Sequence, residues 1–169
     1  MQGYVPGHGV GVKVVNIIPA NVQRGLPTVS AEALLLDVET GRLLAILNGT
    51  VLTALRTAAA CALSVKLLAP RKGGVLTIVG TGYQARYILR FVSTVFQIEK
   101  LELFDIDSRR ARDFAEYANT LGIGDVVVRS DIACALREST VVIESTTAKE
   151  PVILIHIVSI GVRALSAIL

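Results

Sequence analysis

The first 69 residues alternate between short apolar runs and polar turns. Residues 12–18, VKVVNII, form an apolar run of strand length that ends at Pro19. Residues 28–49 hold two more apolar runs on either side of Glu-Thr-Gly-Arg at 39–42, a pattern typical of two strands joined by a turn. The alanine-rich segment 52–68 has high helix propensity and is followed by Pro70 and two glycines. This part is therefore predicted to contain several strands and one long helix.

Beyond residue 74, apolar runs alternate with amphipathic ones. The predicted strands are 74–80, 100–107, 125–130 and 140–146, and the predicted helices are 83–97, 108–122 with Ser108 as N-cap, and 131–139. Strands and helices that alternate at this spacing predict a parallel sheet with right-handed crossovers. The fold class is therefore α/β, a parallel-sheet domain preceded by an incomplete α+β domain, and the boundary is expected near residues 69–74.

Composition narrows the classes of function. Hydrophobic residues make up 52% of the 169 positions and charged residues 18%, so the chain is expected to fold. The net charge of +3 comes from scattered basic residues, without the basic stripe and interleaved aromatics that a nucleic-acid site needs. No nucleic-acid partner is expected.

The cysteines and the chain ends bear on localisation. Cys61 and Cys134 lie in apolar, helix-like segments without a second metal ligand nearby, which favours buried free thiols, no metal site and a reducing cytoplasm. The first residues lack the pattern of a signal peptide. The apolar tail 151–169 has the length of a membrane span, but His156 and Arg163 interrupt it. Buried strand is the favoured interpretation of the tail, and no membrane contact is expected.

One short motif carries candidate chemistry. Gly80, Gly82 and Ala85 occupy the three small-residue positions of a GxGxxA turn between a predicted strand and a predicted helix. In a Rossmann-type βαβ unit the first glycine forms the turn, the second lets the backbone approach a pyrophosphate, and the third small residue allows close packing. The N–H groups of the helix that begins near Tyr83 would face the phosphates.

An acidic residue strengthens the motif. Asp105 ends the next predicted strand, where a carboxylate binds a ribose diol and repels a 2′-phosphate. NAD is therefore expected, with NADP less favoured, although Arg109 and Arg110 weaken this preference. Alternatives stay open, because Asp105 can also simply begin a turn, and the same fold can hold FAD or an S-adenosyl compound.

Two basic residues before residue 69 are candidates for substrate binding. Lys13 lies inside an apolar run, either on the solvent face of an edge strand or in a polar site. Arg56 is surrounded by small residues, which leaves room for a carboxylate to reach its guanidinium, but it is equally compatible with an ordinary exposed helix position.

Longer segments resemble a known family. KVVNIIPAN, GLPTVSAEALLLDVETGRLLAILNGTVLTALRTAAA and IVGTGYQA occur in the order and spacing typical of the ornithine cyclodeaminase/mu-crystallin family, and the resemblance runs from about Gly11 to Gly161. The family includes ornithine cyclodeaminases, alanine dehydrogenases, other amino-acid or imine oxidoreductases and a lens crystallin. The resemblance implies NAD-dependent hydride transfer at the Cα of an amino acid, a small amino-acid, imine or 2-oxo-acid substrate, and a homodimer.

The resemblance also implies residue roles. Lys13 matches the lysine that contacts the substrate carboxylate and assists proton transfer, and Arg56 matches the arginine that clamps this carboxylate near the cofactor phosphates. The remaining matches all concern the cofactor: Thr28 at the nicotinamide, Gly80, Gly82, Tyr83 and Gln84 at the pyrophosphate, Asp105 at the adenosine ribose, and Thr146 on the loop after the fourth strand.

The sequence departs from the family pattern at several positions. Asn48 replaces an acidic residue, and Arg163 stands about where a proton-transferring aspartate is expected. Segments at both ends of the family pattern are expected to be missing. The implied domains are residues 1–69 for substrate binding and dimerisation, 70–151 for NAD binding, and 152–169 for a final strand and tail. A catalytically inactive dinucleotide-binding remnant or fragment is the alternative to an enzyme, and apolar surface between residues 28 and 68 is expected to be exposed.

Overall fold

A computed structural model describes residues 2–148, 150–153 and 163–166 of the chain. The chain separates into two compact units, Met1–Arg56 and Thr57–Leu169, each of which is described by itself. Of the predicted final strand and tail at 152–169, residues 154–162 and 167–169 lie outside the described residues.

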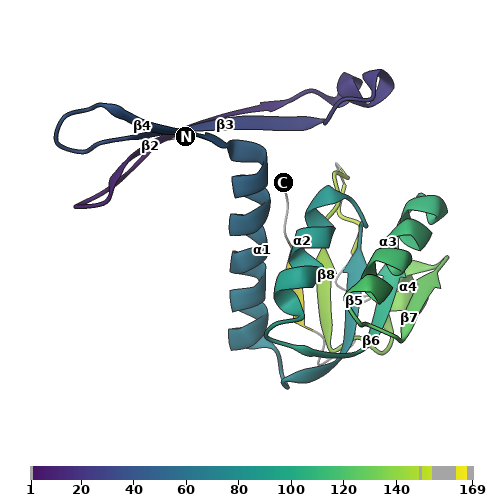
Figure 1. The fold of residues 1–169 in the computed structure, drawn as a ribbon. Helices are drawn as coiled ribbons and strands as arrows, with labels where there is room; N and C mark the ends of the chain where they lie inside the picture. Colours follow the sequence, from purple (N-terminus) through teal and green to yellow (C-terminus); the bar gives the residue numbers. More distant parts are fainter. Residues whose placement is uncertain (1, 149, 154–162, 167–169) are drawn as a thin grey trace. The chain divides into compact units, whose positions relative to one another are not determined.

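The first unit is an antiparallel sheet of four strands in the order β1-β2-β3-β4 (Figure 1). The strands are β1 (Gln2–Val5), β2 (Gly9–Ile17), β3 (Val29–Leu36) and β4 (Leu43–Asn48), and the 3-10 helix η1 (Pro19–Arg24) follows β2. The three predicted strands are present. Strand β1 was not predicted, because all of its residues are exposed and no apolar alternation marks it.

The predicted turn between β3 and β4 is present at residues 37–42. Oδ1 of Asp37 accepts hydrogen bonds of 2.7 Å from both the N–H and the hydroxyl of Thr40, and Gly41 adopts a φ of 67°. An aspartate that binds its own backbone and a glycine with positive φ are standard turn chemistry. The turn thereby sets the register of the two strands.

Helix α1 (Gly49–Leu68) begins three residues earlier than predicted because its start is locked to β3. The Oγ1 of Thr50 accepts a 2.9 Å hydrogen bond from the N–H of Ala31, and a Cβ on Gly49 would come within 2.8 Å of the Ala31 carbonyl carbon. Asn48 caps the helix, since its Oδ1 accepts from the N–H of Val51 at 3.0 Å. At position 49 only glycine permits the close approach to Ala31.

Within the described residues, α1 is also the helix whose length and apolar composition would suffice to cross a membrane. Of its most apolar 18-residue window, 39% is buried inside the structure. Core helices of soluble proteins have the same length and apolar composition. These two properties alone therefore do not identify α1 as a membrane-spanning helix.

The second unit is an α/β structure with a parallel sheet, which confirms the predicted fold class. Its strands are β5 (Gly73–Val79), β6 (Gln97–Phe104), β7 (Val126–Arg129), β8 (Val141–Glu144) and β9 (Arg163–Ser166), in the order β7-β6-β5-β8-β9. The helices are α2 (Tyr83–Val92), α3 (Ser108–Thr120) and α4 (Ile132–Leu136). The chain reverses its strand order at β5, and ligands of such sheets bind at the carboxyl ends of the strands at this point.

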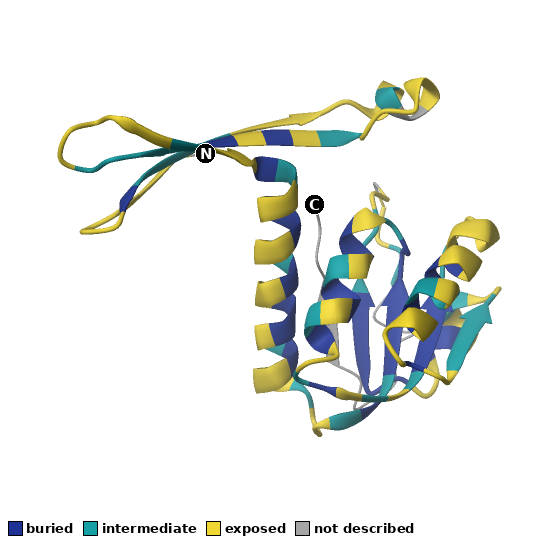
Figure 2. Ribbon diagram, viewed as in Figure 1, coloured by how far each residue is buried: buried dark blue, intermediate teal, exposed yellow. Residues whose placement is uncertain are grey.

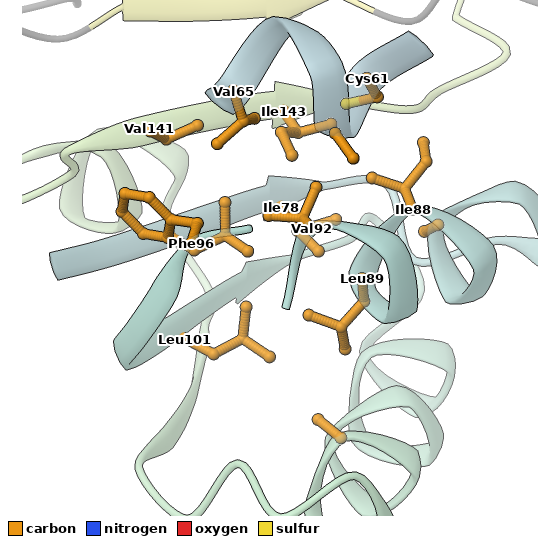
Figure 3. Close-up of a cluster of buried hydrophobic side chains, with 14 of the residues drawn as sticks. Cys61, Val65, Ile78, Ile88, Leu89, Val92, Phe96, Leu101, Val141 and Ile143 are labelled. Carbon is orange, nitrogen blue, oxygen red and sulfur yellow. The ribbon is translucent and has the colours of Figure 1, made fainter. Parts of the chain in front are cut away.

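Apolar side chains of the sheet, α2, α3 and the second half of α1 form the larger of two buried clusters (Figures 2 and 3), and Val79, Leu136 and Val142 form the smaller one. Cys61 and Val65 of α1 belong to the same buried cluster as Ile78, Ile88 and others (Figure 3). This packing explains why the compact units divide between residues 56 and 57, inside α1. A functional boundary at 69–74 stays a prediction.

The helix predicted at 83–97 ends at Val92, and the strand predicted at 100–107 begins at Gln97. Two expectations about side chains are also wrong in this unit. Asp107, rather than Ser108, is the N-cap of α3, because its side chain accepts from the N–H groups of Arg109 and Arg110. Cys61 is buried as predicted, but Cys134 is exposed. Helix α4 is only five residues long, and its buried residues are Ala135 and Leu136, which leaves Cys134 toward solvent.

Candidate functional site

The glycine turn 80–85 lies at the carboxyl end of β5, between β6 and β8. Gly80 has a φ of 88°, and its N–H donates a 2.8 Å hydrogen bond to the carbonyl of Phe104. A Cβ at this position would collide with the carbonyl of Ser145 and the side chain of Thr146. Glycine is therefore required here both by the positive φ and by the close approach of two strands.

Gly82 plays a different part in the same turn. It is the N-cap of α2 with an extended backbone (φ −72°), and a Cβ on it would meet no atom within 4 Å among the described residues. The first N–H groups of α2 are thus bordered by open space, and no side chain caps them in the described part of the chain. Free N–H groups at a helix N-terminus suit phosphate.

Asp105 directly follows β6 and is tied to the glycine turn. Its Oδ2 accepts hydrogen bonds from the N–H and the hydroxyl of Thr81, at 2.7 and 2.8 Å, and its Oδ1 accepts from the N–H of Asp107 at 2.9 Å. An ionised carboxylate has about four lone-pair sites, so one further donor can still bind. Asp105 therefore combines the turn-forming role with the capacity to hold a ribose hydroxyl.

Tyr83 and Gln84 begin α2, but their side chains differ in placement. The hydroxyl of Tyr83 lies 2.9 Å from that of Tyr87, one helical turn onward, and this hydrogen bond raises the pKa of Tyr83 to about 12. The ring of Tyr83 thus packs against that of Tyr87, and its contact with a pyrophosphate stays a prediction. Gln84 is buried beneath the turn.

The loop after β8 completes this edge of the sheet. Oγ1 of Thr146 donates a 3.2 Å hydrogen bond to Oε1 of Glu144, and the N–H of Ser145 binds the carbonyl of Val79. The buried Oγ of Ser145 has no hydrogen-bond partner among the described residues. Buried polar atoms are normally paired, so an unpaired hydroxyl beside the glycine turn is compatible with a ligand that completes it.

In the first unit, Lys13 occupies the middle of β2, opposite Ala33. Its Nζ donates a 2.8 Å hydrogen bond to Oγ1 of Thr53, whose own hydroxyl donates to the carbonyl of Gly49 at 2.6 Å. Lys13 is therefore not a solvent-facing residue of an edge strand, because β2 pairs with strands on both sides. The ammonium group is held against α1.

Arg56 is exposed on α1, three positions after Thr53. Side chains three positions apart lie on the same helix face, with Cβ atoms about 5–6 Å from each other. Lys13 is thus bonded to the helical turn that leads to Arg56, and a carboxylate bound by both cations stays a prediction. Thr28 lies just before β3, and its carbonyl accepts a 2.8 Å hydrogen bond from the N–H of Ile18. Its contact with a nicotinamide stays a prediction.

Arg163 is the first residue of β9, opposite Val141 in β8. An arginine cannot act as a general base at neutral pH, because its guanidinium stays protonated. Within the described part of the chain, no group of three or more His, Cys, Asp or Glu side chains could hold a metal ion.

The structure adds residues that the sequence did not identify. Thr53 orients Lys13, and Thr81 binds Asp105. Both threonines lie next to the motifs that were recognised, one in LTALR and the other between the two glycines of the turn. Their partners are 40 and 24 residues away, which the spacing of a motif does not reveal.

Taken together, the second unit fits a dinucleotide. The glycine turn leaves the N-terminus of α2 open to a pyrophosphate, the Asp105 carboxylate stands at the end of the neighbouring strand, and the unpaired Ser145 hydroxyl borders the turn. These features coincide with the point where the strand order reverses, the usual binding position in such sheets.

Comparisons with known proteins agree with this assignment. The family model of the ornithine cyclodeaminase/mu-crystallin family matches residues 2–168. The Delta(1)-pyrroline-2-carboxylate reductase of Bacillus cereus is 35% identical over 143 residues, covering 85% of this chain and 44% of that protein. The chain thus spans less than half of that relative's length.

Solved structures show the same fold. The Delta(1)-pyrroline-2-carboxylate reductase of Thermococcus litoralis, in complex with NADH and L-proline, superimposes with a TM-score of 0.87 at 34% identity, covering 98% of this chain and 57% of the other. An archaeal alanine dehydrogenase dimer with bound NAD gives a TM-score of 0.89 at 33% identity, covering 97% and 50%. The chain belongs to the ornithine cyclodeaminase/mu-crystallin family.

Proposed function

We propose that this chain binds NAD at the turn 80–85 and takes part in hydride transfer at the Cα of an amino acid or its imine. In this proposal Asp105 binds the adenosine ribose, and Lys13 and Arg56 hold the substrate carboxylate. Thr28, Gly80, Gly82, Tyr83, Gln84 and Thr146 are the proposed further contacts of the cofactor.

The cofactor part of the proposal is supported by the open N-terminus of α2 and by the placement of Asp105. It is also supported by relatives whose structures contain NADH or NAD. When bound, NAD supplies a hydride acceptor or, in its reduced form, a donor. The chain's own residues supply binding and orientation, which is what a hydride-transfer site requires of its protein.

The substrate part rests on one observation, the 2.8 Å hydrogen bond from Lys13 to Thr53, one helical turn before Arg56. Lys13 is thereby bonded to the helix that carries Arg56, and two cations suit binding of a carboxylate. A clamped carboxylate fixes the Cα beside it. L-Proline, the ligand of the related reductase, carries such a carboxylate next to a nitrogen-bearing carbon.

The test is NADH oxidation by the purified full chain with Δ1-pyrroline-2-carboxylate, followed by absorbance. Turnover that is lost in Lys13→Met and kept in Lys66→Met supports the proposal. Lys66 is a suitable control because it is an exposed lysine of α1. Equal turnover in both variants would show that Lys13 does not bind the substrate.

A second candidate function is dinucleotide binding without turnover. It is favoured by Arg163, which stands about where the family resemblance expects a proton-transferring aspartate. In this case NADH binds to the chain, but neither imine reduction nor amino-acid oxidation is detectable. Calorimetry with NADH beside the turnover assay separates the two candidates.

Assembly as a homodimer in the cytoplasm completes the proposal. Large apolar side chains are exposed on the sheet of the first unit, among them Val14 at 57% and Ile46 at 65%. Exposed apolar surface of this kind is usually covered in an assembly, and the related alanine dehydrogenase is a dimer. Two free thiols suit a reducing compartment.

A further inference from the structure

We propose that Thr81 is a positioning residue for the preference for NAD over NADP, because it holds the Asp105 carboxylate in one orientation. The inference rests on the proposed cofactor site and assigns a task to the residue between its two glycines. Thr81 itself is not proposed to touch the cofactor.

The geometry around Asp105 carries the inference. Two donors of Thr81 converge on a single oxygen, Oδ2, with the N–H at 2.7 Å and the hydroxyl at 2.8 Å. The N–H of Asp107 occupies one site on Oδ1 at 2.9 Å. Three hydrogen bonds therefore fix the plane of the carboxylate, and the unused acceptor capacity of Oδ1 has a defined direction.

Burial makes these hydrogen bonds effective. The side chain of Thr81 is only 5% exposed, so water does not readily replace its hydroxyl. Hydrogen bonds to an ionised acceptor are stronger than those between neutral groups. A carboxylate that is ordered before binding avoids an ordering cost when the ribose arrives.

The fixed orientation of the Asp105 carboxylate also allows it to discriminate between NAD and NADP. A fixed carboxylate accepts a hydrogen bond from a 2′-hydroxyl and repels a 2′-phosphate, whereas a carboxylate that can rotate away relieves this repulsion. Of the neighbouring arginines, Arg110 pairs with another carboxylate, since its Nε lies 3.3 Å from Asp107 Oδ2. Loss of the Thr81 hydroxyl should therefore weaken NADH binding more than NADPH binding.

Calorimetric titration of the full chain with NADH and with NADPH tests this in three variants. Thr81→Val keeps the shape and the N–H but lacks the hydroxyl, and Thr81→Ser keeps the hydroxyl. Thr120→Val is the matched control, because it removes a hydroxyl that bonds only the local carbonyl of Tyr117 at the other end of α3.

For Thr81→Val we expect the ratio of the NADPH to the NADH dissociation constant to fall about 3- to 10-fold, the size of one typical net hydrogen bond. Thr81→Ser and Thr120→Val should remain within about twofold of the wild-type ratio. An unchanged ratio in Thr81→Val, with thermal unfolding equal to wild type, would overturn the assignment.

If the wild type binds neither NADH nor NADPH, that result rejects the proposed function but not the role of Thr81. A second measurement then tests the role of Thr81 by itself. Amide hydrogen exchange of the free protein then reports on the carboxylate directly. If the Thr81 hydroxyl positions Asp105, Thr81→Val should speed exchange at the N–H of Asp107, which bonds the other carboxylate oxygen. Equal exchange rates in Thr81→Val and wild type would show that Thr81 does not position Asp105.

Discussion

Arg129 binds the carboxylate of Glu102 through two hydrogen bonds, 2.6 Å from Nε and 2.9 Å from Nη2. Glu102 lies in β6 and is only 2% exposed, and Lys100 Nζ lies 2.6 Å from Oε1, the oxygen that Arg129 Nη2 also binds. The pair joins β6 to the edge strand β7. Removing one partner of a buried ion pair leaves an uncompensated charge.

We therefore expect Glu102→Gln to lower the stability of the fold by about 2–4 kcal/mol, measured by urea unfolding at neutral pH. Glu138→Gln is the matched control, because Glu138 contacts Lys100 only at 3.5 Å and from an exposed position. A control variant that is as destabilised as Glu102→Gln would contradict the importance of burial.

The same pair predicts a pH dependence. Burial opposes ionisation of Glu102, but hydrogen bonds from Arg129 and Lys100 outweigh it, so the pKa is lowered from its ordinary value of 4.5. A carboxyl group with a lowered pKa stabilises the fold above its unfolded-state pKa and loses this contribution as the pH falls through the folded-state value. Stability should thus fall below about pH 4.5. In Glu102→Gln, stability should depend less on pH in this range. An unchanged pH dependence would mean that other carboxyl groups cause the loss of stability.

Thr53→Val is expected to weaken substrate binding without affecting the cofactor. The change removes the acceptor of the Lys13 ammonium and the donor to the Gly49 carbonyl. We expect about a 3- to 10-fold loss of L-proline affinity, measured by calorimetry in the presence of NADH. NADH affinity itself should stay within about twofold of wild type.

Thr57→Val provides the control on the same helix. The buried hydroxyl of Thr57 has no hydrogen-bond partner among the described residues, so its replacement should leave stability unchanged or raise it slightly. Equal losses of proline affinity in the two variants would mean that Thr53 does not act through Lys13.

The two glycines of the turn should respond differently to alanine. Gly80→Ala meets a positive φ and the Ser145 carbonyl, so we expect a loss of at least about 2 kcal/mol in stability. Gly82→Ala has an ordinary φ and open space, so its thermal unfolding should match wild type while NADH binding weakens. Unimpaired NADH binding in Gly82→Ala would place the pyrophosphate elsewhere.

Thiol chemistry distinguishes the two cysteines. Burial raises the pKa of Cys61 to about 11, and a hydrogen bond with Asp131 raises the pKa of the exposed Cys134. Because only the thiolate reacts, a thiol reagent should label one cysteine in the native protein, slowly at neutral pH and faster as the pH rises. Cys134→Ser should abolish native labelling, whereas label on Cys61 before unfolding would contradict its burial.

Local patterns in the sequence determined most of the second unit. Strands β5 and β6 and helices α2 and α3 follow from apolar runs and amphipathic periods of sufficient length, because each pattern describes which side of one element is buried. The glycine turn and Asp105 were recognised for a similar reason, since a tight turn and a strand end impose residue types at a fixed spacing.

Only the tertiary structure decided the contacts that give these residues their roles. The start of α1 at Gly49 depends on Ala31, the place of Lys13 depends on Thr53, and the orientation of Asp105 depends on Thr81. The exposure of Cys134 likewise depends on which side of a very short helix meets the sheet. The first three are contacts between positions far apart in the chain, and the fourth depends on which face of a helix packs against the sheet. Residue spacing within one element predicts neither kind of feature.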